Sequence, residues 1–319
     1  MPEPTAAELA NELRQATLDY LWRQWRVVGA GVTSSSPART IIDPEALLLM
    51  SLTMLEHERR LADVVWSWID VNHALVSVQR LGNLREHFPP AVAQRLAALA
   101  AFRVDHEKDP RWKSLRMAGA DELGQRPAKT RAVNPHFSSW ATLLLQLRMG
   151  MGVGAKADVL AFILGLNPNS PEWASVPMIA ESIGYTTTAV RRVADDLAAA
   201  RFIRVLDTPD TDQATRMFSA HPAPWASLLG ITFNQPGWGY WRERFQFVVA
   251  VLSWLDGEAA RPTSAYTQDV AARDILNRHG AALRKDRIIE PIDFAGAELN
   301  RSYLVFASKA LATWWTNYG

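Results

Sequence analysis

Apolar residues recur every three or four positions along most of this sequence, and residues that begin or end helices interrupt the recurrence. Leu9 and Tyr20 fall on one face of a helix whose start carries a capping-box pattern, Thr5 followed three residues later by Glu8. Asp43, followed by a proline, is a second N-cap candidate. This patterning predicts a mainly α-helical protein.

The composition is that of a globular protein with more than one core. The chain has 319 residues, of which 48% are hydrophobic and 21% charged, and at this length two or more domains are expected. There is no cysteine, so disulfides, thiol catalysis, thiolate zinc sites and iron–sulfur clusters are excluded.

Charge and hydropathy limit which partners and which cellular location can be expected. The formal net charge is +1, so no global field draws the chain to nucleic acid or anionic lipid, and any basic surface is local. Arginine greatly outnumbers lysine, which favours a GC-rich coding genome and a bacterial source. The first residues lack the pattern of a secretory signal. The longest apolar runs reach roughly ten residues, half of what a bilayer span needs. We therefore expect a cytoplasmic protein without a membrane span.

Breaks in the periodicity divide the chain into four expected segments. Between 104 and 136 the apolar pattern lapses, prolines and glycines interrupt it, and basic residues are frequent. This stretch is interpreted as a solvated connector, with a mobile arm on a phosphate backbone as the alternative. The expected segments are a helical domain at 1–103, the connector at 104–136, a domain of three helices and two strands at 137–224, and a helical domain at 225–319.

Residues 156–220 carry the most informative pattern in the sequence. An apolar-striped helix over 156–166 comes first. Ser175 then caps a short helix that Gly184 ends, and Thr186 caps a third helix with Val190 and Leu197 on its inner face. A strand over 203–206, a polar tip and a return strand over 215–219 would form a two-stranded hairpin. The order of elements is therefore three helices followed by a wing.

The outer face of the third helix has the chemistry of a base reader. It presents Thr187, Thr188, Arg191 and Arg192, together with Asp195. Threonine hydroxyls hydrogen-bond to base edges, and arginine can fork onto guanine O6 and N7. The expected wing tip is acidic, with aspartates at 207, 210 and 212, and phosphate would repel it. Base reading is therefore assigned mainly to the third helix.

The segment SVPMIAESIGYTTTAVRRVADDLAAARFIRV resembles the helix, turn, recognition helix and first wing strand of bacterial winged helix-turn-helix transcriptional regulators, in the broad sense that includes MarR-like and ArsR-like proteins. The resemblance implies a DNA-binding transcriptional regulator that acts on double-stranded DNA, as a homodimer with recognition helices about 34 Å apart. The implied DNA-binding residues are Thr186, Thr187, Thr188, Arg191, Arg192, Arg204 and Arg216. The flanking helical regions would then dimerise, sense a small-molecule or protein effector, or recruit a partner.

Two other functions remain open. The winged helix could serve as a protein–protein module or a dimer wall, with the arginine pair in salt bridges to Asp195 and Asp196. An enzyme site in a flanking domain is the second alternative. The seven histidines are scattered, and no metal-ligand spacing, nucleophile elbow or phosphate loop occurs, so we predict no enzyme, cofactor or metal.

The aromatic residues of the last third have two interpretations. The run from 238 to 254 indicates a helical core, with a ligand pocket or partner surface as the alternative. The segment Thr313-Trp314-Trp315 is a candidate for docking a second subunit.

Overall fold

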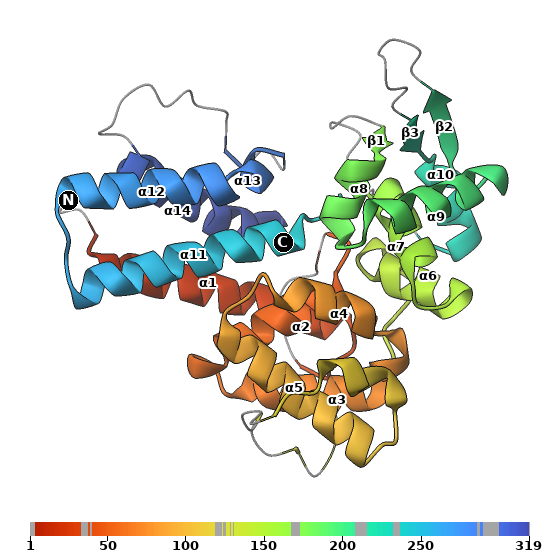
Figure 1. Ribbon diagram of the computed structural model, residues 1–319, viewed down its shortest axis with the longest axis horizontal. Coiled ribbons are helices and arrows are strands. Elements are labelled where there is room, and N and C mark those ends of the chain that lie inside the picture. Colours follow the sequence, from red (N-terminus) through yellow and green to blue (C-terminus); the bar gives the residue numbers. More distant parts are fainter. Residues whose placement is uncertain are drawn as a thin grey trace. The chain divides into compact units, whose positions relative to one another are not determined.

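The computed structural model describes residues 4–32, 38, 40–118, 123, 126–127, 129, 131–166, 173–207, 216–231, 237–285, 288–289 and 300–318. The chain is mostly helical with one small antiparallel sheet (Figure 1), which confirms the predicted mainly α class. It divides into two compact units: unit 1 comprises Met1–Trp22 and Tyr240–Gly319, and unit 2 comprises Arg23–Gly239. These units divide the chain at other places than the four expected segments, whose boundaries stay a prediction.

Unit 1 is built from helices at both ends of the sequence. The Tyr20 ring, near the end of the unit 1 part of α1, stacks on Trp315 at 4.7 Å and on Trp241 at 5.2 Å between ring centroids. Trp315 is fully buried and belongs to the core of its own unit, whereas Thr313 is exposed; docking of a second subunit through the segment Thr313-Trp314-Trp315 stays a prediction. The helices are α1 (Ala6–Val27, up to Trp22), α11 (Trp241–Ala260), α12 (Ala265–His279), α13 (Ala281–Lys285) and α14 (Asn300–Tyr318).

The first half of unit 2 is a helical layer around two tryptophans. Trp25 and Trp68 pack edge to face at 5.6 Å, and the indole N–H of Trp68 donates to the Val28 carbonyl at 2.8 Å. Asp43 caps the next helix as predicted, because its carboxylate accepts from the amides of Glu45 and Ala46. The helices are α2 (Pro44–Thr53), α3 (Arg60–Asn72), α4 (Val78–Arg85) and α5 (Pro90–Asp105).

The described part of 104–136 differs from the solvated connector expected of it. Trp112 and Leu115 of the short 3-10 helix η3 (Pro110–Leu115) are buried. Arg126 pairs with Asp70 at 2.9 Å. The basic residues suggested a solvated stretch, but the buried side chains of Trp112 and Leu115 hold η3 against α4 and α5.

The second half of unit 2 contains the sheet. Its elements are α6 (Leu143–Met151), α7 (Ala155–Leu164), β1 (Ala174–Ser175), α8 (Val176–Ile183), α9 (Thr187–Ala199), β2 (Arg204–Asp207), β3 (Arg216–Ser219) and α10 (Pro222–Leu229). The strand order is β1-β3-β2, all antiparallel, with Ala174 opposite Phe218 and Arg204 opposite Ser219. The expected hairpin therefore has a third strand. β1 is two residues long and its partner lies far along the chain, so no local pattern indicates it.

Within the described residues, every helix falls short of the length and apolar character needed to cross a membrane.

Candidate nucleic-acid interface

Local capping chemistry sets where α8 ends and α9 begins. The Ser175 hydroxyl accepts from the amide of Met178, as an N-cap should. Gly184 ends α8 in the left-handed region with φ 71°, and Thr186 caps α9 by accepting from the amide of Ala189 at 3.2 Å. All three roles were predicted from the sequence and are confirmed.

Helix α9 has one buried and one exposed face. Val190, Val193, Ala194 and Leu197 are buried, and the five exposed positions around its start are those singled out in the sequence. These are Thr186, Thr187, Thr188, Arg191 and Arg192. The hydroxyl of Thr186 accepts from the Ala189 amide as the cap, which leaves its O–H as a donor beside the hydroxyls of Thr187 and Thr188.

The acids of α9 pair with cations outside the arginine pair. Asp195 binds Arg216 of β3 at 2.5 Å, and Asp196 lies 3.4 Å from Lys156 of α7. Among the described residues, neither Arg191 nor Arg192 makes an ion pair, so the expected alternative of bridges to these two aspartates is wrong. Both guanidinium groups are exposed and uncommitted, which is the state an anionic ligand requires.

The two wing arginines are exposed but engaged. Arg204 of β2 lies over the Trp173 ring, 5.3 Å from its centroid, and Arg216 pairs with Asp195. A phosphate would have to compete with these contacts. The aspartates expected at the wing tip, at 210 and 212, lie outside the described residues, as does the turn between the strands.

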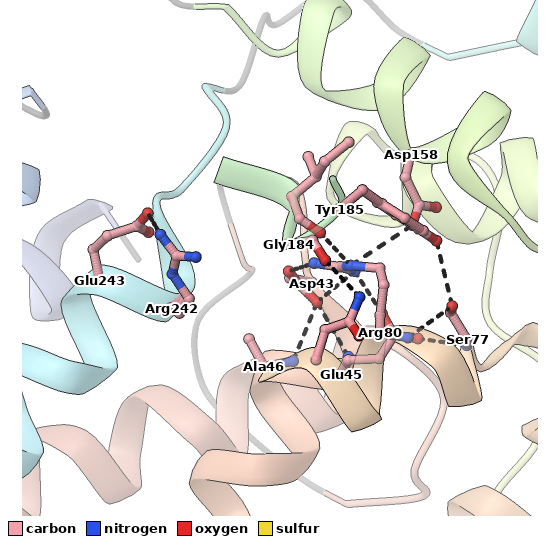
Figure 2. Close-up of polar contacts among 12 residues, drawn as sticks. Asp43, Glu45, Ala46, Ser77, Arg80, Asp158, Gly184, Tyr185, Arg242 and Glu243 are labelled. Atoms are coloured by element: carbon pink, nitrogen blue, oxygen red, sulfur yellow. Dashed lines mark hydrogen bonds and ion pairs between the residues drawn. The ribbon is translucent and has the colours of Figure 1, made fainter. Parts of the chain in front are cut away.

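Five charged side chains that the sequence did not reveal as a group meet beneath the α8–α9 turn. We call them the buried ion cluster: Asp43, Glu45, Arg80, Arg148 and Asp158, all at most 2% exposed. Figure 2 shows the carboxylates of Asp43 and Glu45 directed at Arg80, whose guanidinium lies 2.5 and 2.6 Å from them. Arg148 continues the cluster, at 2.7 Å from Glu45 and 2.8 Å from Asp158.

Neutral groups surround the cluster and extend its hydrogen bonds to Tyr185 of the turn. The Tyr185 hydroxyl donates to Asp158 at 3.1 Å and lies 3.3 Å from the Ser77 hydroxyl. The amide of Ser77 donates to Glu45 at 2.8 Å, and Arg148 donates to the Leu75 carbonyl. None of the polar side-chain atoms of the cluster or of Tyr185 is left without a partner in the described part of the chain. A buried polar network satisfied to this degree favours a single arrangement.

At Asp43 and Arg80, the attraction between opposite charges outweighs the effect of burial on the pKa. Burial alone would raise the pKa of Asp43, but the charge and hydrogen bonds of Arg80 outweigh it and hold that pKa below its ordinary value. Burial alone would likewise lower the pKa of Arg80, yet Asp43, Glu45 and Asp158 raise it. Burial and the charge of Asp158 raise the pKa of Tyr185, so its phenol stays protonated and donates.

In a separate ion pair of unit 1, the effect of burial on the pKa outweighs the attraction between the charges. Glu243 binds Arg242 at 2.7 Å, and Figure 2 also draws these two side chains. Burial raises the pKa of Glu243 more than Arg242 lowers it. Elsewhere in the described residues, no group of three or more histidine, aspartate or glutamate side chains is arranged to hold a metal ion.

No protein-family model matches this chain, and no curated protein or solved structure matches it.

Proposed function

We propose that this chain is a transcriptional regulator that binds double-stranded DNA through a winged helix-turn-helix formed by α7 to β3, and that it acts as a homodimer. The order α7–β1–α8–α9–β2–β3 and the strand order β1-β3-β2 support this proposal. In such an arrangement the third helix, here α9, enters the major groove with its N-terminal residues at the base edges.

The exposed face of α9 is the observation that carries the proposal. Thr187, Thr188, Arg191 and Arg192 lie in its first two turns, exposed and free of ion pairs to described residues. An arginine that forks onto guanine contributes about 1–3 kcal/mol of discrimination. Thr186, Arg204 and Arg216 would act at the edge of the interface: the Thr186 hydroxyl can donate to phosphate while it accepts from Ala189, whereas phosphate would compete with Asp195 for Arg216.

The test replaces the two free arginines of α9. Duplexes bound by the purified full chain are first selected from a random pool, and the affinity of Arg191→Ala/Arg192→Ala for the selected duplex is then measured over a range of salt concentrations. We expect specific binding to weaken at least tenfold, on the order of one lost base contact, and the salt slope to become shallower by up to about 2.

A matched control removes the same charge elsewhere. Arg273→Ala/Arg278→Ala changes two exposed arginines of α12 in unit 1 and should leave affinity and salt slope unchanged. Equal effects of the two double variants, or no selection of any duplex by the wild-type chain, would contradict the proposal. Homodimer binding predicts inverted repeats in the selected sites, with centres one DNA turn, about 34 Å, apart.

A second candidate is a protein–protein module on the same domain. Apolar side chains are exposed beside the wing: Leu228 of α10 is 75% exposed, and Phe202, 43% exposed, packs edge to face on Trp225. Exposed apolar residues of this kind are common at protein interfaces. This candidate predicts that the α9 double variant binds duplex DNA no differently from wild type at any salt concentration.

A further inference from the structure

One face of α4 holds the turn that leads into α9. Arg80 Nε donates to the carbonyl of Ile183 at 2.6 Å, and the Asn83 amide donates to the carbonyl of Gly184 at 3.0 Å. These two acceptors are the last residue of α8 and its cap. Both donors are side chains of a helix that is not part of the proposed winged helix, so the turn is fixed from outside it.

The next residue of the turn is held by its side chain. Tyr185 donates to Asp158 of α7 and lies within hydrogen-bond distance of Ser77, the N-cap of α4. Tyr185 immediately precedes Thr186, whose hydroxyl caps α9. Three consecutive residues are therefore tied to α4 or to the buried ion cluster just before the first residue of α9.

We infer that the buried ion cluster is a positioning device for α9, and that Tyr185 is the positioning residue through which it acts. Residues of α2, α4 and α6 would thus set the orientation in which the recognition helix meets the DNA, and with it the discrimination between sequences. This inference rests on the proposed DNA-binding function for its consequence, but the positioning itself concerns the free protein.

The chemistry of the cluster suits this role. Arg148 is bidentate to Asp158 and also binds both carboxylate oxygens of Glu45, so α7 and α2 are joined through one planar group. Planar, bidentate pairs tolerate little rotation. The hydroxyl of Tyr185 donates to the same oxygen of Asp158, Oδ2, that accepts from Arg148 Nη2. A shift of α9 would therefore break charge-assisted bonds among side chains that are at most 2% exposed, where solvent does not reach to replace them.

The test is Tyr185→Phe in the full chain, which removes the hydroxyl and leaves the ring. Hydrogen exchange is measured at the amides of Ala189 and Val190, which bond to Thr186 in the first turn of α9. We expect their exchange to accelerate roughly tenfold relative to wild type, as the loss of a hydrogen bond to a charged group permits. We expect the ratio of specific to non-specific duplex affinity to fall severalfold, with the salt slope unchanged because the phosphate contacts remain.

The matched control is Tyr266→Phe, which removes an exposed hydroxyl from α12 in unit 1. A merely structural role for Tyr185 would accelerate exchange equally in α2, α5 and α9, or lower stability with the affinity ratio intact, and either result would overturn the inference. Asn83→Ala provides a second variant on the exposed side of α4, with the same local acceleration expected.

The two proposals fail in different ways. If the wild-type chain selects no duplex, the proposed DNA-binding function is refuted. The exchange measurement alone then decides whether Tyr185 positions α9. If the chain binds duplex DNA but Tyr185→Phe matches Tyr266→Phe in both exchange and affinity ratio, only the positioning role is refuted.

Discussion

Arg148 shows at the residue scale how a buried charge is stabilised. Its side chain is fully buried, and its three nitrogens donate to Glu45, Asp158 and the carbonyl of Leu75. Removing a partner from such a group is costly because the remaining charges keep their desolvation penalty and lose their compensation. A substitution of Arg148 is therefore expected to destabilise the protein through the two carboxylates that lose this partner, those of Glu45 and Asp158.

Arg148→Met should lower the free energy of unfolding by about 3–5 kcal/mol, because three buried carboxylates, those of Asp43, Glu45 and Asp158, would be left with Arg80 as their one buried cation. The control is Arg60→Met, which breaks an exposed pair with Glu58 and should have a much smaller effect because solvent screens the pair. Urea unfolding of both variants measures the difference. Comparable losses in the two variants would show that the cluster is not stabilised as described.

The sequence could not reveal the cluster as a group, and the reason lies in these residues. Asp43 was correctly identified as an N-cap. Because capping already explains an aspartate at this position, nothing in the sequence indicated that it also pairs with Arg80. Arg148 and Asp158 interrupt apolar helical faces, which is a signal of buried charge, but Glu45, the second carboxylate that Arg148 binds, is more than a hundred positions away. Pairing at that separation depends on the tertiary fold.

The α8–α9 pair shows at the scale of the element what local patterns can predict. Ser175, Gly184 and Thr186 were identified because capping depends on a side chain and the amides within three residues of it. The apolar and polar faces of α9 followed from its periodicity in the same way. Two features were missed: the hydrogen bonds from α4 to the α8–α9 turn, and the strand β1. Both depend on segments that are far away in the sequence.

Gly184 and Gly230 offer a matched comparison of two helix C-caps. Both have positive φ, 71° and 65°, so alanine at either position should cost about 1–2 kcal/mol in backbone strain. A Cβ on Gly184 would lie 2.9 Å from Leu84 Cδ2 on α4, whereas a Cβ on Gly230 meets nothing within 4 Å. Gly184→Ala should therefore destabilise unit 2 by about 1–3 kcal/mol more than Gly230→Ala. Chemical denaturation measures both, and equal losses would mean that the Leu84 side chain moves aside for the added methyl group.

At the scale of the whole molecule, the chain contains two cores that different parts of the sequence supply. Unit 1 is organised around Tyr20, Trp241 and Trp315, and unit 2 has its own buried aromatic pair in Trp25 and Trp68. Each unit therefore has the apolar interior that an independent cooperative transition requires.

Calorimetry of the full chain should show two transitions, and single core substitutions should assign them. Trp315→Ala is expected to destabilise unit 1 by about 3–5 kcal/mol, and Trp68→Ala to do the same in unit 2. Each variant serves as the control for the other, since it should lower the melting temperature of one transition only. A single transition that moves in both variants would show that the units unfold together.

The discontinuity of unit 1 has a consequence for biosynthesis. Leu9, Leu13 and Tyr20 leave the ribosome with the first helix, while Trp241 and Trp315 are added only after all of unit 2 has been translated. At typical elongation rates this delay is on the order of ten to forty seconds. During this delay the apolar face formed by Leu9, Leu13 and Tyr20 has no native partner from the rest of unit 1. We therefore expect chaperones that bind nascent chains to recognise the first helix.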